Sequence, residues 1–206
     1  MKVLVVDDHA VVRDGLRRLL VTLPNVEIFD AATGREALSF VQRQQPDLIL
    51  LDLHLPGIGG IELLRRLISM SPNVRILVFS MHEDAMRAER AIQLGARGYV
   101  TKSSAPEVLA KAIVEVAAGK LYLSADVAQA IAQSKLTGED HPLKLLTARE
   151  FEIFRLLVAG NGPTEIAAIL SLSAKTVANN RTLINQKLRT SGDVELMLLA
   201  MRHKLL

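Results

Sequence analysis

The sequence predicts an α/β fold, a five-stranded, doubly wound parallel sheet, followed by a second, all-α domain. Five short apolar runs recur at a nearly constant pitch through the first 101 residues, and stretches with helical periodicity separate them. Strands and helices that alternate in this way are typical of parallel βαβ units with helices on both faces of the sheet. The alternation stops after Gly119, and the rest of the chain carries helical patterns only.

The predicted strands begin 23, 22, 27 and 23 residues apart. They are Val3–Val6, Val26–Phe29, Leu48–Leu51, Arg75–Phe79 and Gly98–Val100. The helical stretches between them place apolar residues at intervals of three and four. These are the sets Val12, Leu16, Leu19 and Leu20, then Ile61, Leu64, Leu67 and Ile68, and then Val108, Ala112, Val116 and Ala117. Turn-forming residues lie between each predicted helix and the next predicted strand, which supports the alternation.

The domain boundaries follow from where these patterns change. Residues 1–122 form the first predicted domain, and 143–206 the second. Between them, 123–142 is predicted to be a linker with a possible short helix, because its end is polar, mixed in charge and interrupted by Gly138 and Pro142. In the second domain, Thr147 and Glu150 form a capping-box pattern before an apolar run.

Two more helices of the second domain have recognisable starts. Ser173 is a plausible cap for a helix that runs to about Leu188, and Asp193 marks the approximate start of a last helix.

The bulk composition excludes several classes of protein. Half of the 206 residues are apolar, so the chain can build a packed core. It has no cysteine, which excludes disulfides and cysteine-based zinc sites and suits a cytoplasmic protein. No apolar run approaches the length that crosses a bilayer, and the N-terminus does not resemble a signal peptide, so we expect no membrane association.

Ionisable side chains follow several predicted strands directly. Asp7 and Asp8 follow the first strand, and Asp52 follows the third. In the strand order 2-1-3-4-5, the first and third strands are neighbours, so the three carboxylates would meet in one pocket at the carboxyl edge. Like charges this close need a positive partner, and Mg²⁺ with oxygen ligands fits beside a phosphate group.

Two further groups join the same edge. Ser80 lies at the C-terminal end of the fourth strand, and Lys102 at the C-terminal end of the fifth. A hydroxyl and an ammonium both suit phosphoryl oxygens. Acids at strand ends are common in turns, and each residue alone would carry little weight. Their combination on four separate strands favours a functional site.

These segments resemble the receiver domain of two-component response regulators, which has a flavodoxin-like fold. The resemblance rests on "VLVVDDH", "LILLDLHLPGIGGIELL", "ILVFSMHED" and "GARGYVTKSS", and it covers about 1–122. It implies that Asp52 accepts a phosphoryl group from the phosphohistidine of a sensor histidine kinase. It also implies that Asp8 and Asp52, with the backbone carbonyl of His54, ligate Mg²⁺, and that Asp7 acts through water.

The resemblance assigns three further roles. Ser80 and Lys102 would contact the phosphoryl oxygens, and Tyr99 would be the switch aromatic that turns inward as Ser80 moves. The chain departs from many receivers at Ser103, where they have proline, and at Met81, which is bulkier than usual.

Two histidines adjoin the predicted pocket. The side chains of His9 and His54 could serve as metal ligands or bases. We expect them to line the rim without ligating, because oxygen ligands already suffice.

A basic stretch without any acid lies within 172–189. On a helical wheel, Val177, Ile184 and Leu188 form one face. The opposite face is polar or cationic and suits the major groove of DNA, although an ordinary exposed helix would look similar. It consists of Lys175, Asn179, Thr182 and Gln186, with Arg181, Lys187 and Arg189 placed near phosphates.

The order of motifs favours DNA binding. "LTAREFEIFRLLVAGNGPTEIAAILSLSAKTVANNRTLINQKL" resembles the LuxR-type helix-turn-helix, so the whole chain resembles a NarL/FixJ-family transcriptional regulator. The resemblance implies binding to double-stranded DNA through Lys175, Thr176, Asn179, Arg181, Thr182, Gln186 and Lys187. It departs from many relatives at Ala178 and Asn180. The apolar stripe Val194, Leu198 and Met201 could be core, but the resemblance favours homodimerisation, at least of the phosphorylated protein.

The resemblance implies a transcriptional response regulator and not an enzyme, with phosphorylation of Asp52 controlling dimerisation and DNA binding. One alternative is an aspartate-nucleophile phosphohydrolase. Such an enzyme requires an Asp-x-Asp arrangement after the first strand, and this chain has Asp-Asp-His there. It also requires a cap insertion, and no insertion in this chain is long enough. The other is a receiver whose second domain binds only proteins, which Ala178 makes conceivable.

Overall fold

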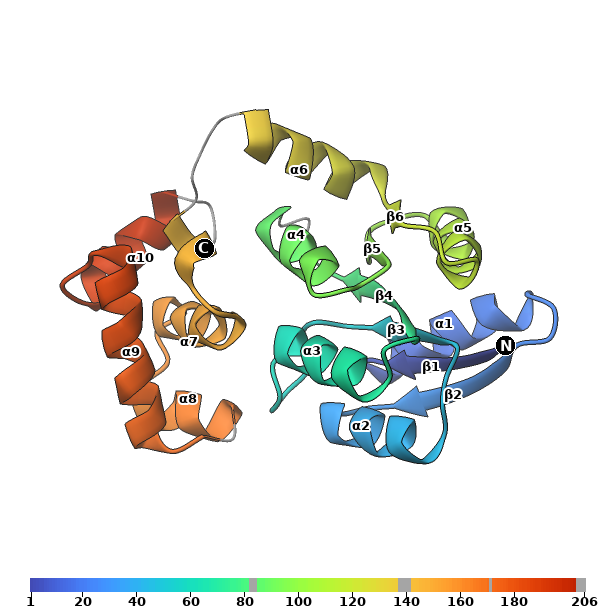
Figure 1. Cartoon of the computed structure of the whole chain (residues 1–206), viewed down its shortest axis with the longest axis horizontal. Helices are drawn as coiled ribbons and strands as arrows, with labels where there is room; N and C mark the ends of the chain where they lie inside the picture. The colour runs from blue at the N-terminus through green and yellow to red at the C-terminus, as the bar shows by residue number, and fades with distance from the viewer. Residues whose placement is uncertain (82–84, 137–141, 171, 203–206) are drawn as a thin grey trace. The chain divides into compact units, whose positions relative to one another are not determined.

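The computed structural model describes residues 1–81, 85–136, 142–170 and 172–202, and Figure 1 gives their arrangement. The chain divides into two compact units, and the division falls within residues 137–141, outside the described residues. None of the described helices combines the length and the apolar composition needed to span a membrane.

The first unit is a parallel sheet with helices on both faces (Figure 1). Its strands are β1 (Lys2–Val6), β2 (Glu27–Ala31), β3 (Leu48–Leu51), β4 (Arg75–Ser80), β5 (Gly98–Thr101) and β6 (Tyr122–Leu123). Its helices are α1 (Ala10–Val21), α2 (Gly34–Arg43), α3 (Gly60–Met70), α4 (Ala85–Gln93), α5 (Pro106–Ala117) and α6 (Ala125–Leu136). The strand order β2-β1-β3-β4-β5-β6 makes β1 and β3 neighbours, as predicted.

The predicted fold class is confirmed, but the sheet has one strand more than the five that the sequence predicts. Tyr122 pairs with Gly98, and Leu123 pairs with Tyr99. A side chain on Gly98 would come within 3.0 Å of the Tyr122 carbonyl oxygen, so glycine permits this approach. With only two residues, β6 leaves no apolar run that sequence analysis could detect.

Alternation along the strands divides the core into two layers. Val5, Leu50 and Phe79 belong to one buried cluster with residues of α1 and α5. Their neighbours in sequence, such as Leu4 and Ile49, point to the opposite face and are also completely buried. Because both faces are covered, only the edges of the sheet and the ends of its strands remain for a polar site.

The possible short helix within 123–142 is present as α6, which packs against α4 and β5. The buried Thr101 hydroxyl at the end of β5 donates a hydrogen bond of 2.6 Å to Asp126 in the first turn of α6. Residues 123–136 therefore pack onto the first unit, while 137–141 lie outside the described residues.

The second unit is all-helical. It contains the 3₁₀ turn η1 (Pro142–Leu145) and the helices α7 (Ala148–Val158), α8 (Pro163–Ile169), α9 (Ala174–Leu188) and α10 (Asp193–Arg202). The predicted capping box at Thr147 and Glu150 is present, and the Ser173 side chain caps α9. As predicted, α8 packs on α9, with Val177, Ile184 and Leu188 of α9 buried.

Candidate functional site

The ends of β1 and β3 bring two buried carboxylates together. Val6 and Leu51 are paired in register, so the next residues, Asp7 and Asp52, leave the sheet side by side. The backbone N–H of Asp52 continues the ladder by donating to the Val6 carbonyl oxygen at 2.9 Å. Asp7 and Asp52 are only 1% and 2% exposed, so both carboxylates require polar partners.

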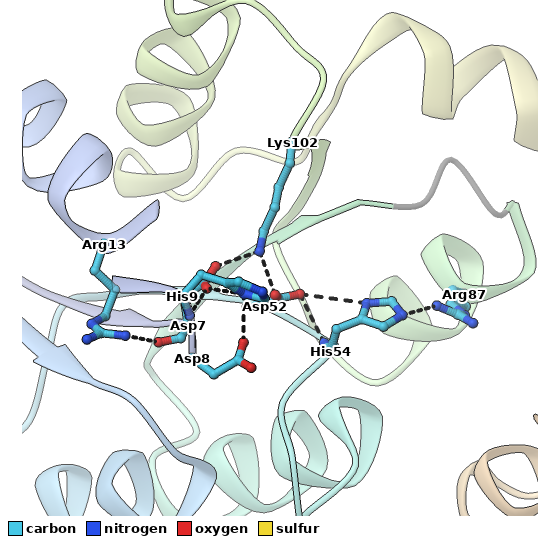
Figure 2. A network of polar contacts seen from close by, with 8 residues as sticks. All are labelled: Asp7, Asp8, His9, Arg13, Asp52, His54, Arg87 and Lys102. Atoms are coloured by element: carbon cyan, nitrogen blue, oxygen red, sulfur yellow. Dashed lines mark hydrogen bonds and ion pairs between the residues drawn. The ribbon is translucent and has the colours of Figure 1, made fainter. Parts of the chain in front are cut away.

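Lys102 supplies the main partner. Its Nζ donates to Asp7 Oδ2 and to Asp52 Oδ2, both at 2.6 Å (Figure 2). The backbone N–H of Lys102 donates to the Ser80 carbonyl oxygen, which fixes where the side chain leaves β5. Burial by itself would lower the pKa of Lys102, but its contacts with the two carboxylates outweigh this effect and raise the pKa.

The Asp52 carboxylate remains ionised well below neutral pH. Burial would raise its pKa, but His54 and Lys102 together lower the pKa from 3.8 to about 2. The backbone N–H of His54 donates to Asp52 Oδ1 at 3.0 Å, while Lys102 holds Oδ2. The Asp52 side chain is therefore held at both oxygens and in its charged form, the form in which a carboxylate can act as a nucleophile.

Asp8 and His9 complete an acidic cluster at this edge. Asp8 is partly exposed, and His9 Nδ1 lies 3.0 Å from its Oδ1. Possible ligand atoms of Asp7, Asp8, His9 and Asp52 all lie within 4.8 Å of one another. Arg13 donates to the backbone carbonyl of Asp7 rather than to its carboxylate.

The charges of this cluster fit a divalent cation. Three carboxylates, those of Asp7, Asp8 and Asp52, face the single ammonium of Lys102, which leaves two negative charges in excess. Hard oxygen donors at this spacing can hold a metal ion. The site thus provides an acidic pocket of the predicted kind, with His9 at its rim.

The hydroxyl predicted for this edge lies in the interior. Ser80 is fully buried, and its Oγ has no hydrogen-bond partner among the residues that the structure describes. A buried polar atom without a partner is unusual and is consistent with an absent ligand. Tyr99 is also completely buried, with its Cα paired to Val78.

Beside this pocket the structure reveals a contact that sequence analysis does not predict. Arg87, a buried residue of α4, lies with its Nη1 3.0 Å from His54 Nε2. The imidazole of His54 is thus placed between Arg87 and Asp52 (Figure 2). An arginine on an amphipathic helix carries no sequence signal for such a contact, because the partner is 33 residues away.

The second candidate site is the outward face of α9. Lys175, Asn179, Thr182 and Gln186 are exposed, as the helical wheel predicts, and Thr176 and Arg181 are partly exposed. Arg181 Nη2 forms an exposed ion pair of 2.8 Å with Asp193. Leu183, which the prediction does not include, is 46% exposed.

Lys187 differs from the other residues predicted to contact DNA. Its Nζ donates to the buried Glu150 carboxylate at 2.6 Å. Burial would raise the pKa of Glu150, but Lys187 and the Thr147 cap lower it. Lys187 is therefore engaged in joining α9 to the start of α7, and a phosphate would have to share it.

Comparison with known proteins finds a family match for each of the two units. Residues 3–114 match the response regulator receiver domain, and residues 144–200 match the bacterial regulatory proteins of the luxR family. The chain is 36% identical to response regulator UvrY of Escherichia coli, over all of this chain and 95% of that protein. It is 37% identical to response regulator GacA of Pseudomonas aeruginosa, over 98% of this chain and 96% of that protein.

A solved structure shows the same architecture. RcsB from Salmonella enterica serovar Typhimurium, bound to a promoter in the presence of the phosphomimetic BeF₃⁻, is 25% identical over 97% of each chain, with a TM-score of 0.74. The receiver and luxR-family matches, together with relatives above 30% identity over the full chain, establish the family. The chain belongs to the response regulators in which a receiver domain precedes a LuxR-type helix-turn-helix domain.

Proposed function

We propose that this chain is a transcriptional response regulator that a sensor histidine kinase phosphorylates on Asp52, and that phosphorylation controls its dimerisation and its binding to double-stranded DNA. The carrying observation is the buried Asp52 carboxylate, held by Lys102 at one oxygen and by the His54 N–H at the other.

Asp52 is the nucleophile of the proposed transfer. Because its pKa is about 2, the carboxylate is charged at neutral pH. One of its oxygens forms a bond to phosphorus as the bond from phosphorus to the kinase imidazole breaks, and the imidazole nitrogen keeps the electron pair. Lys102 and Ser80 then bind phosphoryl oxygens, which would give the buried Ser80 hydroxyl a partner.

The excess negative charge of the pocket supports Mg²⁺ as the metal ion. Asp8, Asp52 and the backbone carbonyl of His54 would hold it, with Asp7 acting through water. When bound, Mg²⁺ supplies positive charge opposite the oxygens of the group in transfer.

Ser80 and Tyr99 would transmit a change in the pocket to the helices at the surface of the receiver. The Cα of Ser80 pairs with that of Thr101, two residues after Tyr99 on β5. If Ser80 moves toward a phosphoryl group, the end of β5 has to adjust, and Tyr99 is the large side chain within it. The helices that contact β5, namely α4, α5 and α6, would repack as a two-state element.

The polar face of α9 supports binding to the major groove of duplex DNA. Its exposed residues offer hydrogen-bond donors and acceptors for base edges and cations for phosphates. We assign these contacts to Lys175, Thr176, Asn179, Arg181, Thr182, Gln186 and Lys187. Lys187 would contact DNA while it also binds Glu150. Complexes of RcsB with DNA provide a precedent within the family.

The apolar stripe of α10 supports a dimer. Val194, Leu198 and Met201 are 75%, 55% and 60% exposed, so they are not core residues of the second unit. A second copy of this chain would cover them, and a two-fold dimer would then read two half-sites.

A single experiment tests the proposal and separates it from its alternatives. The protein is incubated with a small-molecule phosphodonor and Mg²⁺, and intact mass and duplex binding are measured on the same samples. We expect wild type to gain one phosphoryl group and to bind DNA more tightly, and Asp52→Asn to do neither. Because acyl phosphates can be short-lived, BeF₃⁻ serves as a stable replacement.

The other outcomes have definite meanings. A phosphohydrolase would release phosphate catalytically from added phosphomonoesters. A protein-interaction module would take up the phosphoryl group and never shift duplex DNA. Modification of Asp52→Asn to the same extent as wild type would refute the assignment of the acceptor.

A further inference from the structure

Arg87 and His54 join helix α4 to the phosphorylation pocket. Arg87 is 7% exposed, and its Nη1 lies 3.0 Å from Nε2 of His54. His54 lies two residues after Asp52 in the sequence, and its side chain is 27% exposed. The pair therefore occupies the space between the first turn of α4 and the end of β3 (Figure 2).

The chemistry of this pair determines the position of a proton. A guanidinium group is charged at all physiological pH values and can only donate hydrogen bonds. Nε2 of His54 must then be the acceptor. A neutral imidazole with an acceptor at Nε2 carries its proton on Nδ1.

The protonated nitrogen is the one on the side of the phosphoacceptor. Nδ1 of His54 lies 3.8 Å from Asp52 Oδ1, the same oxygen that accepts the His54 backbone N–H. At this distance the imidazole makes only a long contact with the carboxylate, although that contact helps to lower the pKa of Asp52. A phosphoryl group on Asp52 would add anionic oxygens next to this N–H.

We propose that Arg87 is a positioning residue of the phosphorylation site: it fixes His54 as the Nδ1–H tautomer, so that His54 donates a hydrogen bond to the phosphoryl group on Asp52. This inference rests on the proposed function, since it requires Asp52 to carry a phosphoryl group. It also means that α4 is linked to the state of Asp52 through His54, independently of Ser80 and Tyr99.

The first part of the test needs no phosphorylation. Nitrogen-15 correlation spectra of histidine side chains distinguish the two neutral tautomers, and His54→Ala assigns the signal. In wild type we expect His54 to carry its proton on Nδ1. Arg87→Lys should keep this tautomer, because an ammonium also only donates, whereas Arg87→Met should lose it.

The control is Arg97→Met, which removes an exposed arginine just before β5. It should leave the His54 spectrum unchanged. A wild-type His54 protonated on Nε2, or an Arg87→Met variant with the wild-type tautomer, would overturn the proposal. A purely structural role of Arg87 predicts no dependence of the tautomer on the chemistry of residue 87.

The second part measures the affinity for BeF₃⁻ in the presence of Mg²⁺. His54→Ala and Arg87→Met should each weaken binding by about tenfold, the typical effect of one hydrogen bond to a charged group. The double variant should be no weaker than the single ones, because both remove the same donor. Arg87→Lys should restore most of the affinity.

The two parts separate this inference from the proposed function. If wild type does not bind BeF₃⁻, the proposed function fails, and the inference that depends on it fails with it. If wild type binds, Asp52→Asn does not, and the Arg87 and His54 variants bind as wild type, only the inference fails. Additive losses in the double variant would likewise refute the shared donor.

Discussion

The ammonium of Lys102 and the carboxylate of Asp52 form a buried ion pair, with 2.6 Å between Nζ and Oδ2. The same Nζ binds Asp7 Oδ2 at 2.6 Å, so one side chain joins the ends of β1, β3 and β5. A phosphoryl group on Asp52 would compete for this ammonium. The ion pair therefore stabilises the unphosphorylated pocket, and phosphorylation of Asp52 would weaken it.

Removal of the ammonium should destabilise the receiver. In Lys102→Met, the carboxylates of Asp7 and Asp52 stay buried without their cation, and we expect a loss of about 3 kcal/mol in the free energy of unfolding. Urea unfolding measures this loss, and added Mg²⁺ should recover part of it. Lys120→Met, which breaks an exposed pair with Glu115, should change the stability by less than about 0.5 kcal/mol. Equal effects of the two substitutions would contradict the buried pair.

Asp52 should make the stability depend on pH at the acidic end. Its pKa is lower in the folded protein, about 2, than the ordinary value of 3.8. The stabilisation, about 2 kcal/mol, is therefore present above pH 3.8 and is lost as the pH falls through about 2. Urea unfolding of wild type and Asp52→Asn without Mg²⁺ should show a stability difference that shrinks over this range. A difference that stays constant would show that Asp52 titrates alike in the folded and unfolded chains.

The composition of the pocket could be predicted from sequence because strand ends are easy to locate. Apolar runs end at Val6, Leu51 and Val100, and parallel strands end at the same edge of the sheet. The residues that follow were therefore expected to meet, and Asp7, Asp52 and Lys102 do so. The helical wheel likewise predicted which residues of α9 face outward.

The missed features depend on contacts between distant residues. The pair between Arg87 and His54 joins α4 to the loop after β3, and the pair between Lys187 and Glu150 joins α9 to α7. No periodicity in the sequence specifies either contact. From the sequence alone, Lys187 near the end of α9 resembles a residue that contacts phosphate. Its contact with Glu150 follows only from the packing of α9 on α7. The strand β6 is too short to leave a pattern.

Lys175 and Arg181 should contribute to DNA affinity without contributing to stability. Lys175 is exposed, and Arg181 forms an exposed ion pair with Asp193. Alanine at either position should change the free energy of unfolding by less than about 0.5 kcal/mol. Each variant that loses one phosphate contact should show a smaller salt dependence. The magnitude of the slope of the log association constant against log salt concentration should decrease by about 1, as measured by fluorescence anisotropy with duplex DNA. Unchanged binding in both variants would refute the placement of α9 in the groove.

Lys187 should behave in the opposite way. In Lys187→Met the buried Glu150 carboxylate loses its cation, although its bonds to the Thr147 cap remain. We expect a loss of about 1 to 2 kcal/mol in the stability of the second unit, measured by urea unfolding. The conservative Lys187→Arg should retain most of that stability. A variant as stable as wild type but weaker on DNA would instead make Lys187 a plain phosphate contact.

The stripe on α10 should govern assembly. Leu198→Glu places a charge on a side chain that is 55% exposed, so the monomer should remain folded, with its stability changed by less than about 0.5 kcal/mol. If a second copy covers this stripe, the buried glutamate should prevent dimer formation. Sedimentation of the BeF₃⁻-bound protein should then show monomers. Affinity for DNA with two half-sites should fall by at least about tenfold, and that for a single half-site should not. Met70→Glu on α3, another exposed apolar position, should leave both assembly and binding unchanged, and a dimeric Leu198→Glu would remove α10 from the interface.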